Sequence, residues 1–236
     1  LDEQLLEDLV EDIRRCGREV VSVAGSVADW SVAESLVNKA VECYGQLDGL
    51  VNNAGLHYSA EPWLEHPDKI KNLYEVNVLG ATYCGVNALK IMVAQRHGAI
   101  VNLSSGAHLG VEKQATYSAS KGAVASLTYG WSIDAAPYGV RVNAIAPLAH
   151  TRMTEALTQY NTSAQRNTSQ NADVNAHQVD VNQPESIAPL VEYLLSDFSA
   201  QISGQLIRFD GEALSILRHP QISDKHYHDS DWDLYK

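Results

Sequence analysis

Apolar residues along this chain follow helical and strand-like spacings in turn. Within residues 5–13 they recur every three or four positions, which predicts an amphipathic helix that ends at Gly17. Residues 20–23 and 47–51 are short apolar runs of the kind that forms strands, and between them the helical spacing returns over residues 32–41. Strands that alternate with helices of this length indicate βαβ units and therefore a parallel sheet.

The same alternation continues through the rest of the chain, apart from one long polar stretch. We expect three further helices and three further strands, over residues 68–96, 115–136 and 187–195 for the helices and 99–104, 140–146 and 204–209 for the strands. Residues 154–184 are rich in Asn, Gln, Thr and Ser, and they are either a mobile surface loop or a functional lid. We favour the lid, because a loop this long in a compact domain usually has a function or is disordered.

Composition limits the classes of partner. The 236 residues are 45% apolar, which is enough for one α/β domain with a sizeable core. The net charge of −12 argues against nucleic acid or an anionic membrane as partner, and no apolar run approaches the roughly 18 residues of a membrane span. The three cysteines have no metal-ligand spacing, so we expect reduced thiols, a cytoplasmic location and no metal site.

One pair of residues suggests acid/base chemistry. Tyr117 and Lys121 are four residues apart in a predicted helix without proline, so they share one face of it. The pKa of a phenol is near 10 in water, and an ammonium close by favours the phenolate and lowers that pKa. The pair is therefore a candidate general acid/base, and the alternative is an ordinary surface pair.

Other short motifs accompany this pair in a fixed order. They are Asn52-Asn53-Ala54-Gly55, Val76-Asn77-Val78, the run from Gly98 to Ser105, the run from Arg141 to Pro147 and the run from Gly204 to Gly211. In this order and spacing the set closely resembles the short-chain dehydrogenase/reductase family over residues 1–217. The resemblance implies a three-layer, Rossmann-like, doubly wound parallel sheet of the α/β class. We expect one such domain, residues 1–217, and a polar tail, residues 218–236.

The resemblance implies an NAD(P)-dependent oxidoreductase that interconverts a secondary alcohol and a ketone. In that family role Tyr117 is the general acid/base, and Lys121 lowers its pKa and holds the nicotinamide ribose. Ser105 orients the substrate oxygen. Ser104 is its competitor: counting back from Tyr117 favours Ser104, whereas the register of the preceding strand favours Ser105. The main chain of Asn77 holds a water in a proton relay through Lys121, and a tolerated surface Asn is the alternative.

The positions that resemble the family's adenosine site are matched in part. Asn53, Ala54 and Gly55 would let the adenosine ribose pass close to bare backbone, although an ordinary turn has the same composition. Val27 is a further expected cofactor contact. Ser26 precedes it where the family has an adenine-contacting Asp, which departs from the pattern.

The positions that resemble the nicotinamide site also depart from the pattern. Pro147 and Thr151 are the expected contacts, but Leu148 replaces the usual Gly and Thr151 lies one residue closer to the proline. The cofactor is NAD or NADP, and the sequence does not say which.

The family's N-terminal unit of strand, Gly-rich turn, helix and strand has no counterpart in this sequence. That unit holds the cofactor pyrophosphate on backbone N–H groups. We expect the sheet to be N-terminally truncated, with residues 20–23 left without a neighbouring strand. We expect the unit to exist in the native polypeptide, and the alternative is that residues 20–23 pair with another chain.

Two other functions remain open on the same scaffold. Tyr117 would move protons without a hydride in a cofactor-free epimerase, dehydratase or cyclase, and a non-catalytic subunit would stabilise an active partner. In each of the enzyme readings the substrate is a small carbonyl or alcohol. By family resemblance we also expect a homodimer or homotetramer, assembled through the two long helices over residues 68–96 and 115–136.

Overall fold

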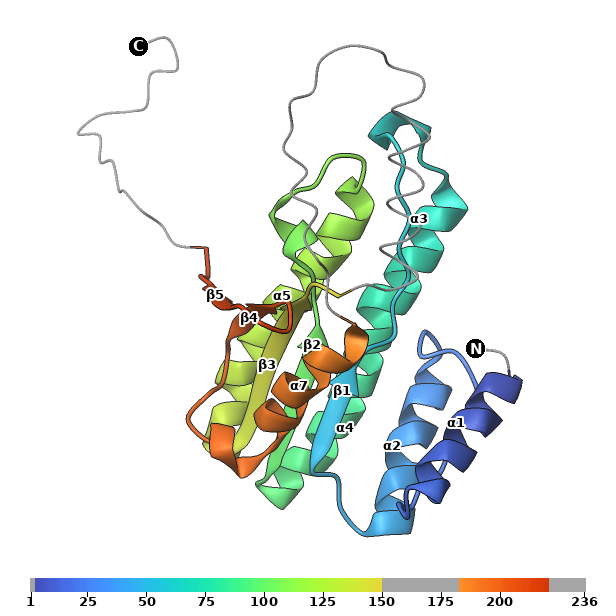
Figure 1. Ribbon diagram of the computed structural model, residues 1–236, viewed down its shortest axis with the longest axis vertical. Helices are drawn as coiled ribbons and strands as arrows, with labels where there is room; N and C mark the ends of the chain where they lie inside the picture. Colours follow the sequence, from blue (N-terminus) through green and yellow to red (C-terminus); the bar gives the residue numbers. More distant parts are fainter. Residues whose placement is uncertain (1–2, 150–182, 221–236) are drawn as a thin grey trace, which may run out of the picture.

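The computed structural model describes residues 3–149 and 183–220 (Figure 1). Its helices are α1 (Glu3–Arg15), α2 (Trp30–Tyr44), α3 (Pro67–Tyr74), α4 (Ala81–Gln95), α5 (Ala115–Ala135) and α7 (Ala188–Leu195). Its strands are β1 (Gly49–Asn52), β2 (Gly98–Leu103), β3 (Val140–Pro147), β4 (Leu206–Phe209) and β5 (Leu214–Leu217). The expected elements are therefore present, with the exceptions given below.

The strands form one sheet with helices on both faces. Its order is β1-β2-β3-β4-β5, and the first four strands are parallel. Helices α4 and α5 cover one face and α7 covers the other (Figure 1). This arrangement confirms the expected three-layer, doubly wound α/β fold.

Alternate residues of the central strands build two separate cores. Side chains of β2 and β3 on one face pack against α4, and those on the other face pack against α7. The largest fully buried members are Met92, Ile100 and Val142 in the first core and Val101, Ile145 and Leu194 in the second. Burying one such side chain contributes about 1.5–3 kcal/mol to folding, so these two cores supply most of the driving force.

Residues 20–23, predicted as a strand, belong to no strand of the described structure. Within the described residues β1 forms one edge of the sheet, and α1 and α2 lie beside that edge (Figure 1). A short apolar run without a neighbouring strand cannot satisfy its backbone groups, which explains the wrong assignment. The apolar face of α1 is correspondingly open, with Leu5 and Leu9 about half exposed.

The long helix expected over residues 68–96 is interrupted. Residues Glu75–Gly80 form a π-helical turn between α3 and α4. A π turn is rare and frequently marks a functional site, and Asn77 lies inside this one. The combined run Pro67–Gln95 is long and apolar enough to cross a membrane by length and composition, but α4 packs on β1 and β2 as a core helix does.

The sequence also did not predict β5. Residues Leu214–Leu217 pair antiparallel with β4, after a turn in which the Asp210 side chain accepts hydrogen bonds from the backbone N–H groups of Glu212 and Ala213. The tail expected after residue 217 falls mostly on residues 221–236, outside the described residues.

A chain of buried amides ties the helices to the sheet. Asn52 of β1 donates to Asn102 of β2 at 2.8 Å, and Asn102 donates to the Thr128 hydroxyl of α5 at 2.9 Å. The Asn52 amide also reaches the Ala81 carbonyl at the start of α4. All three side chains are nearly or fully buried, so each hydrogen bond replaces solvation that folding removes.

Asn102→Ala should lower the free energy of unfolding by about 3 kcal/mol, because it leaves Asn52 and Thr128 short of a buried partner. Denaturant unfolding followed by circular dichroism measures this. Asn38→Ala, on the exposed side of α2, should stay within about 0.5 kcal/mol of the parent protein. Equal effects of the two substitutions would contradict the structural role given to Asn102.

Candidate active site

The motif residues meet at the carboxyl ends of the parallel strands. Asn53, Ala54 and Gly55 follow β1, the two serines Ser104 and Ser105 follow β2, and Pro147 ends β3. Tyr117 lies in the first turn of α5, which crosses the end of β2. Ligands of open parallel sheets bind at this edge, so the fold places the predicted residues where a site is expected.

Lys121 is joined twice to the end of β2. Its Nζ donates to the Leu103 carbonyl at 2.7 Å, and its own carbonyl accepts from the Ser104 hydroxyl at 2.9 Å. The side chain is only 6% exposed, and burial lowers the pKa of Lys121 to about 8. Its position in α5 is therefore set by the strand.

The two serines have different environments. Ser104 is buried, and its hydroxyl is engaged by the Lys121 carbonyl. Ser105 begins the short helix Gly106–Leu109, where its Oγ accepts from the Ala107 N–H, and a hydrogen bond from the Ser105 side chain also lowers the pKa of Tyr117. The Ser104 hydroxyl is therefore committed to the Lys121 carbonyl, whereas that of Ser105 lies at the start of the short helix.

Burial raises the pKa of Tyr117, and the Ser105 hydrogen bond opposes that rise. The expected lowering by Lys121 is not found. Lys121 Nζ lies 5.8 Å from the centroid of the Tyr117 ring and donates to the Leu103 carbonyl instead. Desolvation disfavours the charged forms of both Tyr117 and Lys121 here. The spacing of the two residues along the helix therefore predicted the wrong direction for the pKa shift of Tyr117.

Asn77 has a role that the sequence did not reveal. Its side chain accepts from the Leu56 N–H at 2.7 Å, donates to the Leu56 carbonyl at 2.9 Å, and donates to the Ser120 hydroxyl at 3.1 Å. The π turn thus fastens the segment after Gly55 to α5. A Cβ added at Gly55 would lie 3.5 Å from both Asn77 Oδ1 and Lys121 Nζ, so the bare backbone passes close to both groups.

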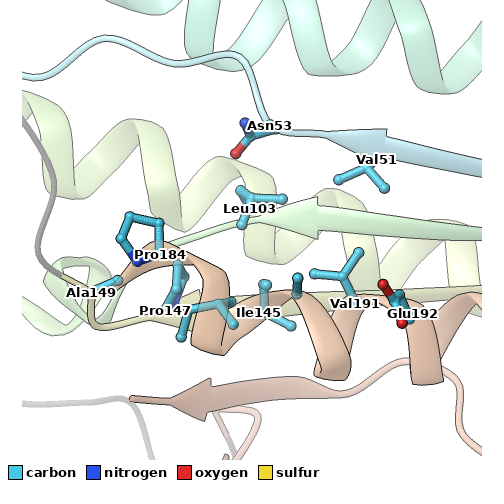
Figure 2. A pocket seen from close by; sticks show the side chains of 11 residues that line it. Val51, Asn53, Leu103, Ile145, Pro147, Ala149, Pro184, Val191 and Glu192 are labelled. Atoms are coloured by element: carbon cyan, nitrogen blue, oxygen red, sulfur yellow. The ribbon is translucent and has the colours of Figure 1, made fainter. Parts of the chain in front are cut away.

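A cavity of about 560 Å³ opens between the strand ends and α7 (Figure 2). Asn53, Leu103 and Pro147 line it from the sheet, and Val191 and Glu192 line it from α7. Its volume is in the range of ordinary ligand pockets, and its walls are mostly apolar. Leu103, whose side chain lines the cavity, also accepts the hydrogen bond from the Lys121 ammonium through its carbonyl.

The expected adenosine residues, apart from Gly55, line a second, smaller cavity of about 70 Å³. Val27, Asn53, Ala54 and Gly80 contribute to it. Val27 packs so close to Gly80 that a Cβ there would approach it to 2.6 Å, so the Val27 position depends on glycine in the π turn. Thr151 and most of the expected lid, residues 154–184, lie outside the described residues.

Sequence reasoning missed a second polar cluster beside Tyr117. The Tyr58 hydroxyl donates to the Glu65 carboxylate at 2.8 Å, and the Thr116 hydroxyl donates to the same carboxylate oxygen. Burial and the negative charge of Glu65 raise the pKa of Tyr58 to about 12, so this phenol stays neutral. In the sequence this cluster appears only as a Tyr and a Glu seven residues apart. That spacing is common, so the cluster cannot be recognised without the fold.

Asn77→Ala should free the Leu56 backbone, and amide hydrogen exchange at Leu56 should become roughly tenfold faster or more. Asn87→Ala is the matched control. Asn87 is equally buried on α4, but its amide bonds only to the Tyr83 carbonyl one turn away and to Lys90. Unchanged exchange at Leu56 in the Asn77 variant, or the same acceleration in both variants, would refute the clamp.

Comparisons with known proteins show the family to which the chain belongs. The family described as short chain dehydrogenase matches residues 1–163. The 3-oxoacyl-(acyl-carrier-protein) reductase FabG of Thermotoga maritima is 30% identical over 213 residues, 89% of this chain and 84% of that protein. A short chain dehydrogenase structure from Mycobacterium avium gives a TM-score of 0.81 at 30% identity, covering 97% and 75% of the two chains. NAD⁺-bound xylitol dehydrogenase gives 0.78 at 29% identity, covering 89% and 85%. This chain belongs to the short-chain dehydrogenase family of oxidoreductases.

Proposed function

We propose that the protein is an NAD(P)-dependent oxidoreductase that interconverts a secondary alcohol and a ketone. The observation that carries the proposal is that Ser105, Tyr117 and the buried, strand-anchored Lys121 come together at the open end of the sheet. The similarity to a reductase of 3-oxoacyl groups and to a xylitol dehydrogenase holding NAD⁺ supports this class of reaction and cofactor.

Tyr117 supplies the proton in the reductive direction. Its raised pKa keeps the phenol protonated at neutral pH, which suits a general acid. A bound reduced nicotinamide would supply the hydride that the carbonyl carbon gains. Tyr117 would give its proton to the carbonyl oxygen, so that the ketone becomes a secondary alcohol and the cofactor is left oxidised. In the other direction the phenolate accepts the alcohol proton.

Ser105 and Lys121 would orient the substrate and the cofactor. The Ser105 hydroxyl donates to the substrate oxygen, where negative charge develops in the transition state. Lys121, whose Nζ donates to the Leu103 carbonyl, would hold the ribose hydroxyls of the cofactor. Asn53 and Gly55 offer backbone along which the cofactor passes, and Pro147 forms part of the apolar wall against the ring.

Tyr117→Phe should lower kcat roughly a thousandfold, because it removes the proton donor. Consumption of NADH and NADPH over a panel of ketones measures this, with circular dichroism to confirm folding. Tyr129→Phe, on the same helix with its ring against His219, should keep near-parental kcat. A folded parent protein that consumes neither cofactor with any ketone would contradict the proposal and favour a cofactor-free catalyst or a non-catalytic subunit.

Ser105→Ala should move the pKa seen in the pH profile of alcohol oxidation upward, because the hydrogen bond that lowers the pKa of Tyr117 is lost. It should also lower kcat/KM roughly a hundredfold. Ser104→Ala should instead lower the free energy of unfolding by about 1–2 kcal/mol and leave the profile in place, since the Ser104 hydroxyl donates to the Lys121 carbonyl. A shifted profile in the Ser104 variant alone would reverse the two roles.

A further inference from the structure

Three buried side-chain atoms within the described residues lack a hydrogen-bond partner, and all three belong to segments that carry the site. They are His57 Nε2, Ser59 Oγ and Ser118 Oγ. Two come from the segment after Gly55, and the third follows Tyr117 directly. Buried polar groups in folded proteins are almost always paired, and an unpaired one costs about 1–3 kcal/mol. Such a group beside a candidate acid indicates a place for a ligand.

His57 is the one of the three that contacts the proposed acid. Its ring centroid lies 4.6 Å from that of Tyr117, at an interplanar angle of 80°. This edge-on contact fixes the imidazole beside the phenol. A group bound by His57 therefore lies beside the Tyr117 ring.

Both chain neighbours of His57 are anchored. Asn77 holds the backbone of Leu56 on one side, and Glu65 holds the Tyr58 hydroxyl on the other. Glu65 is itself bonded to Thr116, the residue before Tyr117. The imidazole is thus held through contacts to the π turn and to α5, the helix that carries Tyr117. It therefore needs little ordering when a ligand binds.

The imidazole is neutral at neutral pH. Burial lowers the pKa of His57, and the charge of Lys121 lowers it further. The Gln114 side chain lies near enough to raise it against that trend, but Nε2 has no partner of hydrogen-bonding geometry among the described residues. A neutral imidazole offers one donor and one acceptor, so it can bind a hydroxyl or a carbonyl.

We infer that His57 Nε2 binds a second oxygen of the substrate, on the carbon next to the reacting one, so that the preferred substrates are α-hydroxy ketones and the matching vicinal diols. This inference rests on the proposed function. Its physical basis is that a substrate oxygen bound there would give His57 Nε2 the hydrogen-bond partner that it lacks among the described residues, beside the Tyr117 ring.

The test compares cyclohexanone with its α-hydroxy derivative, in the full chain and in two variants. The parent protein should have a kcat/KM at least about tenfold higher for the hydroxy ketone. His57→Phe keeps a ring against Tyr117 but removes Nε2, and it should abolish that preference. His57→Gln places an amide near the same point and should restore part of the preference. His97→Phe, at the opposite end of β2, should behave as the parent protein.

A second readout does not depend on turnover. The nitrogen chemical shift of His57 Nε2 should change when the hydroxy ketone is added and stay in place with cyclohexanone. A parent protein that turns over both ketones without preference, or an unmoved Nε2 signal, overturns the inference and leaves the proposed function standing. Failure to consume either cofactor with any ketone overturns the proposed function, and the inference with it.

Discussion

The site depends on the double attachment of Lys121 to the end of β2. One bond runs from the ammonium to the Leu103 carbonyl and the other from the Ser104 hydroxyl to the Lys121 carbonyl. Together they fix the first turns of α5, and hence Tyr117, relative to the strand that leads into Ser105. An ammonium in so buried a place is costly, and the lowered pKa of Lys121 shows that cost. Strongly shifted pKa values of this kind are typical of functional sites rather than of stable cores.

Around this attachment the molecule separates apolar packing from polar positioning. Apolar side chains of β2 and β3 hold the layers together, whereas polar side chains at the strand ends fix the loops. The amide chain from Asn52 to Thr128 joins the sheet to α5, and the Asn77 clamp joins the segment after Gly55 to the same helix. Groups held this way need little reorganisation during a reaction, which is the condition for electrostatic stabilisation of a transition state.

Much of this could be read from the sequence, and the remainder follows from interactions that the sequence does not display. Periodicity found nearly all the helices and strands, and the strand register selected Ser105 over Ser104, a choice that stays a prediction. Residues 20–23 have the composition of a strand but no partner strand among the described residues. Composition alone does not show whether a neighbouring strand is present. The pKa of Tyr117 was misjudged because helix spacing gives proximity but not burial. The roles of Asn77 and His57 depend on contacts across 21 residues and across elements, which local pattern cannot show.

The central claim is that these residues form a site for hydride and proton transfer to a carbonyl carbon and its oxygen. It is tested most directly by giving the full chain a ketone and a reduced nicotinamide cofactor deuterated at the hydride-donating carbon, and analysing the product by mass spectrometry and NMR. The account predicts one deuterium on the carbinol carbon of a single alcohol stereoisomer. An unlabelled product, or a folded protein that forms no alcohol from any ketone tested with either cofactor, would contradict it.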